Sequence, residues 1–143
     1  MQLMHVSFCV FLVLFGLTAF FLGKETIYFD LSADKGETIY PLFPIMAIIL
    51  LSLGSFLHNR FLADINLQLP FEEKLTRYQV AFIIRAAFFE AAGLMNIVGF
   101  IVITNSVFLI VTGIVLLIFI ALRPTRDGLI NALSLSYPDT EKL

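Results

Sequence analysis

Four apolar runs, three of them without a charged residue, dominate this 143-residue chain, and each is long enough to cross a bilayer as a helix. A bilayer core about 30 Å thick requires roughly 20 helical residues. The composition agrees, because 59% of the residues are apolar and only 14% are charged, whereas soluble domains average about 25% charged residues. We therefore expect an all-α integral membrane protein, a four-helix bundle with spans at about 6–23, 41–57, 78–103 and 106–122.

The four spans are expected to form a single domain over residues 1–143, with 123–143 as a cytoplasmic tail. Only Thr104 and Asn105 separate the third span from the fourth, which begins at Ser106, so these two spans should form a tight antiparallel hairpin. The segment 1–5 contains no Lys or Arg, unlike the start of a secretory signal peptide. We expect the first apolar run to be retained as a span.

Basic residues in the short polar segments predict the orientation. The segment between the first and second spans holds two, Lys24 and Lys35, together with four acidic residues. The segments expected on the other side hold six, namely Arg60, Lys74, Arg77, Arg123, Arg126 and Lys142. This asymmetry predicts that both termini are cytoplasmic (N-in/C-in) and that the protein is a multi-pass protein of a bacterial inner membrane.

Two polar segments carry helical signals of their own. Pro70, followed by Phe71 and two glutamates, is typical of a helix start, so the third helix should begin in the cytoplasm before it enters the membrane. Residues 59–69 have apolar side chains three and four positions apart, which predicts either a helical extension of the second span or a segment on the headgroups. Residues 125–135 repeat this pattern after Pro124. We expect both to be short interfacial helical segments that anchor the cytoplasmic ends of the spans.

Two ionisable residues inside the third span, Arg85 and Glu90, are the strongest functional candidates, since charge within a bilayer is costly. Counted from Tyr78 at 1.5 Å per residue, Arg85 lies about 10 Å into the helix and Glu90 about 18 Å, close to the expected bilayer midplane. A separation of five residues suits a direct ion pair poorly, so each side chain should face a different neighbour. Asn96 lies on the same stripe of the helix as Arg85.

Small residues surround these polar groups, and small residues let helix backbones approach closely in lipid. The predicted helix-packing surface consists of Ala86, Ala87, Ala91, Ala92 and Gly93. Two interpretations of the polar residues stay open at this point. Either Glu90, Arg85 and Asn96 make interhelical hydrogen bonds, or Glu90 binds a proton or a cation during transport.

Other kinds of chemistry find no support in the sequence. A net charge of −2 without a basic stripe gives no indication of nucleic-acid binding. A single cysteine excludes an internal disulfide, and two distant histidines with one cysteine make no metal set. Neither a nucleophile with its base nor a phosphate-binding loop is recognisable. We expect no catalytic residue, no cofactor and no metal.

The run from Pro70 to Asn105, with EKL, Tyr78, IIRAAFFEAAGL and a Thr-Asn turn, followed by RPT at 123–125, resembles an uncharacterised family of small four-span bacterial inner-membrane proteins. That resemblance covers most of the chain and implies the four-span fold without an activity. A more local likeness, carried by LPFEEKLTRY and AFIIRAAFFEAAGLMNIVGFIV, is to the helical hairpin of the proteolipid c subunit of rotary ATPases. It implies that Glu90 occupies the ion-binding position.

The polar, small-residue surface on the third span and the scarcity of sequence outside the membrane favour a non-enzymatic role. We expect a subunit, stabiliser or regulator of a larger membrane assembly, or a homo-oligomer, whose partners are the lipid bilayer and other membrane-protein subunits. The alternative is an ion-coupled carrier or a proteolipid-like subunit in which Glu90 is the proton or cation site.

Overall fold

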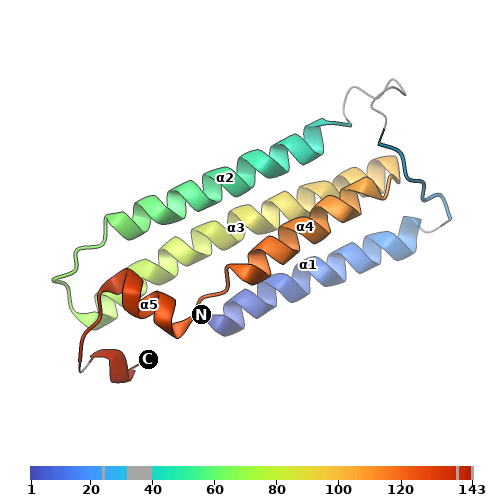
Figure 1. The fold of residues 1–143 in the computed structure, drawn as a ribbon. Coiled ribbons are helices and arrows are strands. Elements are labelled where there is room, and N and C mark those ends of the chain that lie inside the picture. Colours follow the sequence, from blue (N-terminus) through green and yellow to red (C-terminus); the bar gives the residue numbers. More distant parts are fainter. Residues whose placement is uncertain (24, 32–39, 138, 143) are drawn as a thin grey trace.

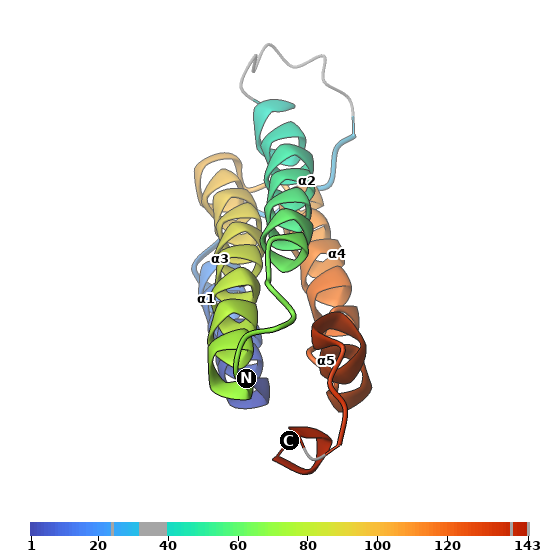
Figure 2. The same ribbon diagram turned by 90° about the vertical axis from the view of Figure 1, so that its left-hand side faces the viewer.

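The structure, a computed structural model, describes residues 1–23, 25–31, 40–137 and 139–142, and it is all-α. Helices account for 79% of the described residues, which contain no strand. Four long helices lie side by side, and a short fifth helix lies across one end (Figures 1 and 2). In chain order the elements are α1 (Gln2–Gly23), α2 (Leu42–Ala63), α3 (Phe71–Ile103), α4 (Val107–Ala121), α5 (Arg126–Leu133) and the 3₁₀ turn η1 (Asp139–Lys142). The predicted all-α class is confirmed.

Three helices, α1, α2 and α3, are long and apolar enough to cross a membrane. Helix α4 has 15 residues and is about 22 Å long, so it is shorter than the hydrocarbon core of a typical bilayer. A bend of 68° separates it from α5, and only the two together would count as a fourth span. Pro124 lies in this break, where its ring prevents the helix from continuing. The structure therefore has three such helices, or four with the broken pair.

Helix α3 is the centre of the arrangement, because it packs against each of α1, α2 and α4. Half of its most apolar stretch is buried, compared with 11% for α1. Its start after Pro70 agrees with the predicted helix start, and at 33 residues it is much longer than the predicted span of 78–103. The first part of α3 extends beyond the N-terminal end of α1 (Figure 1).

Glycines set how closely the outer helices approach α3. A Cβ added at Gly54 of α2 would lie 2.6 Å from the Cβ of Phe88, and one added at Gly93 would lie 2.7 Å from the Leu12 side chain of α1. A Cβ at Gly16 would make an ordinary contact of 3.7 Å with the Ile97 side chain. Both α1–α3 pairs are 81 positions apart, so the two helices run parallel. This register places Gln2, the first residue of α1, level with about residue 83 of α3.

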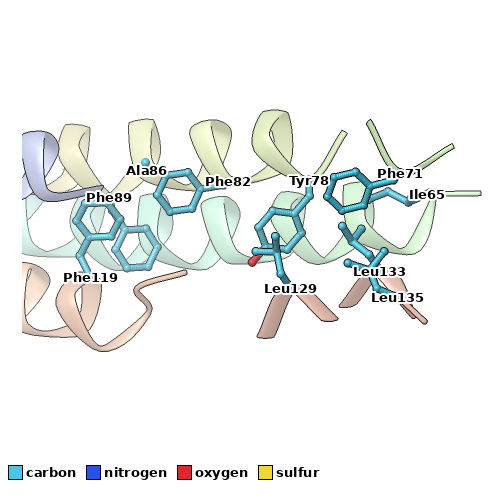
Figure 3. Close-up of a cluster of buried hydrophobic side chains, with 10 residues drawn as sticks. All are labelled: Ile65, Phe71, Tyr78, Phe82, Ala86, Phe89, Phe119, Leu129, Leu133 and Leu135. Atoms are coloured by element: carbon cyan, nitrogen blue, oxygen red, sulfur yellow. The ribbon is translucent and has the colours of Figure 1, made fainter. Parts of the chain in front are cut away.

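The part of α3 that extends beyond α1 is covered by α5. The apolar face of α5, Leu129 and Leu133, packs with Leu135 against Phe71 and Tyr78 (Figure 3). The Thr125 hydroxyl caps the helix by accepting a 3.1 Å hydrogen bond from the Gly128 amide. A helix in this segment agrees with the sequence pattern, but its apolar face contacts protein and not headgroups, because the long α3 offers an apolar surface there.

The segment after the second predicted span divides into two parts. Its first part, up to Ala63, continues α2, which is the helical extension given above as one of two possibilities. Ile65 then turns inward and joins the cluster around Phe71 and Tyr78 (Figure 3).

The turn between α3 and α4 also anchors the connection between α1 and α2. Thr104 ends α3 in the left-handed conformation, with φ 58°, and α4 begins at Val107, so the predicted tight hairpin is confirmed. The buried Asn105 side chain donates to the Asp30 carbonyl at 2.7 Å and accepts from the Val107 amide at 3.1 Å. The Tyr28 amide donates to the Thr104 carbonyl on one side of the turn, and the Ser106 amide on the other side donates to the Tyr28 carbonyl.

Tyr40 completes this network. Its hydroxyl donates to the Asp30 carbonyl at 2.8 Å and accepts from the Asn105 amide group at 3.3 Å. Burial, together with the nearby Asp30 carboxylate, raises the pKa of the Tyr40 hydroxyl and so favours its protonated, donating form. The predicted orientation relied on charges between the first and second spans. Four of these charged residues, Lys24, Lys35 and the acidic Asp34 and Glu37, lie outside the described residues.

Candidate functional site

Arg85 and Glu90 face different neighbours, as expected from their spacing. The Arg85 Nη2 atom donates a 3.0 Å hydrogen bond to the Leu122 carbonyl at the C-terminal end of α4. One turn earlier, the Phe119 carbonyl lies 2.9 Å from Nε2 of the buried His5 of α1. The last carbonyls of a helix have no partners within the helix and carry its negative dipole end, so α1 and α3 together cap α4.

Glu90 lies on the opposite side, in a groove between α1 and α3. The groove has a volume of about 660 Å³, and the other residues that line it are Met4, Ser7, Phe8, Phe11 and Leu94. Among the residues that the structure describes, the partly buried Glu90 carboxylate has neither a hydrogen bond nor an ion pair. The Ser7 hydroxyl, the other polar group of the lining, donates to the Leu3 carbonyl of its own helix at 2.9 Å.

The parallel register of α1 and α3 determines the depth of Glu90. It places Glu90 beside Cys9, about 10 Å from the start of the 22-residue α1, which is about 33 Å long. Measured along α1, Glu90 therefore lies about a third of the way along the helix, and its expected place near the bilayer midplane stays a prediction. Tyr78, from which that depth was counted, lies beyond the N-terminal end of α1 and is buried together with residues of α5. By the same register, Arg85 lies level with the N-terminal end of α1.

Asn96 belongs to another interface. Its fully buried side chain donates to the Phe43 carbonyl of α2 at 3.4 Å and to the Ala92 carbonyl of its own helix at 2.9 Å. The structure thus does not bring Asn96, Arg85 and Glu90 together: they contact α2, α4 and the α1 groove respectively. Of these three residues, only Glu90 has no hydrogen bond or ion pair among the residues described.

The predicted small-residue packing surface divides into two parts. Ala86, Ala92 and Gly93 are buried against neighbouring helices. Ala87 and Ala91 are exposed, so among the described residues no other helix covers them, and their role in helix packing stays a prediction. The physical reason is the helical period: residues 87 and 91 lie on the side of α3 that no other helix of the chain covers.

Several buried polar residues were not recognised as such from the sequence. His5 and His58 adjoin the ends of the first and second predicted spans, yet both are buried, and the His58 ring stacks edge-on against Tyr78 with centroids 6.1 Å apart. The Thr112 hydroxyl of α4 donates to the Gly93 carbonyl across the helix pair at 3.3 Å. Each lies in or next to an apolar run, where local sequence does not distinguish a lipid-facing position from a protein-facing one.

Cys9 is half-buried, with its Sγ 4.0 Å from Nδ1 of His5. Within the described part of the chain, no group of three His, Cys, Asp or Glu side chains has an arrangement that would hold a metal ion.

Comparisons of the chain with protein-family models, with curated proteins and with solved structures found no match. The two resemblances drawn from the sequence therefore stay predictions, and the geometry around Glu90 is the basis of the functional argument.

Proposed function

We propose that this chain is a non-enzymatic membrane protein that acts as a subunit, stabiliser or regulator of a larger membrane assembly. It crosses the bacterial inner membrane four times, with residues of about 106–122, which include α4, as the last span and with the tail from 123 and both termini in the cytoplasm. The distribution of basic residues supports this orientation.

One observation carries the proposal: the Glu90 carboxylate lies in an outward-facing apolar groove and has no polar partner among the described residues. Ionisable groups in spans are costly and almost always pair or line a pathway. Arg85 and Asn96, by contrast, each donate to a main-chain carbonyl of another helix, although Arg85 Nε and Asn96 Oδ1 have no partner among the described residues. We infer that the partner of Glu90 belongs to another subunit.

The test is co-purification. The C-terminally tagged chain is extracted from native membranes in a mild detergent, and its associated proteins and total mass are measured. Recovery in a stoichiometric complex that Glu90→Gln weakens supports the proposal. Recovery as a monomer contradicts it. The matched control is Glu72→Gln, which changes an exposed acid in the first turn of the same helix, away from the groove.

The second candidate is a proton-coupled carrier or proteolipid-like subunit. The same unpaired carboxylate favours it, because a lone acid in an apolar groove can take up a proton. A bare metal cation fits less well, since cations such as Ca²⁺ or Mg²⁺ require about six oxygen ligands, and the lining offers only the Glu90 carboxylate and the Ser7 hydroxyl as side-chain oxygens. Loss of proton flux in liposomes on Glu90→Gln, with retention on Glu90→Asp, would favour this candidate.

A further inference from the structure

We propose that the groove between α1 and α3 is the docking site for a membrane-spanning helix of a partner subunit, and that this helix carries a lysine or arginine that pairs with Glu90. This inference rests on the proposed function and adds the chemistry of the partner. It specifies the charge of the contact residue, its depth and the face of the chain that it meets.

The lining of the groove suits a cation on an apolar helix. Phe8 and Phe11 are aromatic, Met4 and Leu94 are apolar, and Glu90 supplies a negative charge. Aromatic faces attract ammonium and guanidinium groups, and a carboxylate accepts charge-assisted hydrogen bonds from both. Except for the Glu90 and Ser7 oxygens, the side chains of the lining suit the apolar body of a transmembrane helix.

The cation has to come from outside the chain. Arg85, five residues from Glu90 on the same helix, has its Nη2 bonded to the Leu122 carbonyl and faces α4. The Ser7 hydroxyl donates within its own helix. Among the described residues of the four long helices, Arg85 is the only Lys or Arg level with α1. Arg126 of α5 lies against Met1, Gln2 and Leu3 at the start of α1 and does not line the groove. On its long helices a second copy would therefore bring only the same engaged arginine to this depth, which favours a different chain.

The register gives the depth of the partner's charge. Glu90 lies beside Cys9, about seven residues from the start of α1. The partner's lysine or arginine should lie a similar distance from the same end of its span. On the α3 side of the groove, the exposed small residues Ala87 and Ala91 allow a backbone to approach closely.

Binding of designed peptides tests the pairing. The purified full chain is labelled with a donor dye and placed in phosphatidylcholine nanodiscs with acceptor-labelled leucine–alanine peptides of about 22 residues. One peptide carries a single lysine about seven residues from one end, and its matched control carries leucine there. We expect the lysine peptide to bind about tenfold more tightly, the size of one interhelical polar contact in lipid.

Substitutions then assign the effect to Glu90. Glu90→Gln should remove the preference for lysine, and Glu72→Gln should keep it. Glu90→Lys should reverse the preference, so that the chain favours a peptide with glutamate at the same position. Equal binding of the lysine and leucine peptides to the unaltered chain, or a lysine preference that survives Glu90→Gln, would overturn the proposal.

Failure of this inference differs from failure of the proposed function. If a native complex is recovered but persists with Glu90→Gln, and its partner has no basic residue at this depth, the pairing is wrong while the subunit role stands. If the chain is recovered alone from native membranes, the subunit role itself fails.

Discussion

Arg85 of α3 closes the end of α4 through a 3.0 Å hydrogen bond from its Nη2 atom to the carbonyl oxygen of Leu122. This contact accounts for a positive charge in an otherwise apolar run. The C-terminal end of a helix carries a partial negative charge and carbonyls without intrahelical partners, and a guanidinium satisfies both. The same contact separates Arg85 from Glu90 and leaves the acid to face the α1 groove.

Replacing Arg85 with methionine should destabilise the protein by about 1–3 kcal/mol, because the Leu122 carbonyl loses its donor. Arg85→Lys should have an intermediate effect, since it keeps the charge but not the planar guanidinium. Unfolding by denaturing detergent, followed by circular dichroism, measures the change. Arg77→Met is the control, since it removes only an exposed pair with Glu73 four residues earlier and should cost less than about 0.5 kcal/mol. Equal effects of Arg85→Met and Arg77→Met would contradict the capping role.

Gly54→Ala should separate α2 from α3. The added Cβ would lie 2.6 Å from the Cβ of Phe88, an atom fixed to the backbone of α3, so the helices have to move apart. We expect a loss of about 1–3 kcal/mol in the free energy of unfolding, typical of overpacking. Gly113→Ala is the matched control, because an added Cβ at Gly113 of α4 meets nothing within 4 Å. That change should be neutral or stabilising by up to about 1 kcal/mol. Comparable destabilisation by both would show that helix spacing is not the cause.

Asn105→Leu should release the loop around Tyr28 from the α3–α4 turn. The Asp30 carbonyl and the Val107 amide lose a partner, at a cost of about 1–3 kcal/mol. Hydrogen exchange should speed up at the amides of Tyr28 and Ser106, which bond across the turn. The exposed Asn59 on α2 provides the control substitution Asn59→Leu, which should leave exchange at these amides unchanged. Unaltered protection in Asn105→Leu would mean that the main-chain bonds alone hold the loop.

The orientation can be tested with single cysteines in a Cys9→Ser background. Thr26 and Ser136 are exposed and lie in segments predicted on opposite sides of the membrane. Thr26→Cys should react with a membrane-impermeant maleimide in intact cells. Ser136→Cys should react only after the membrane is permeabilised. Labelling of both in intact cells, or of neither, would rule out the proposed arrangement of the spans.

The sequence allowed the helices to be placed because their signals are local. The start of α3 after Pro70, the turn at Thr104–Ser106 and the break at Pro124 depend on residues next to one another in the chain. The separation of Arg85 from Glu90 followed from helix geometry alone. The position of Glu90 along the bundle could not be read from α3 alone, because it depends on how α1 lies along α3. That register is set by Gly93 and Gly16 meeting Leu12 and Ile97, contacts between residues distant in sequence.

The sequence by itself determined the all-α class and three helices long and apolar enough to span a membrane. The reason is that long apolar runs in lipid satisfy their backbone groups through hydrogen bonds within each helix. The tertiary structure decided which polar side chains have partners. In an apolar helix the sequence does not distinguish a face toward lipid from a face toward protein, because both are lined by similar side chains. Only the packing of α1, α2 and α4 around α3 shows that Arg85 and Asn96 bond within the chain and that Glu90 faces outward.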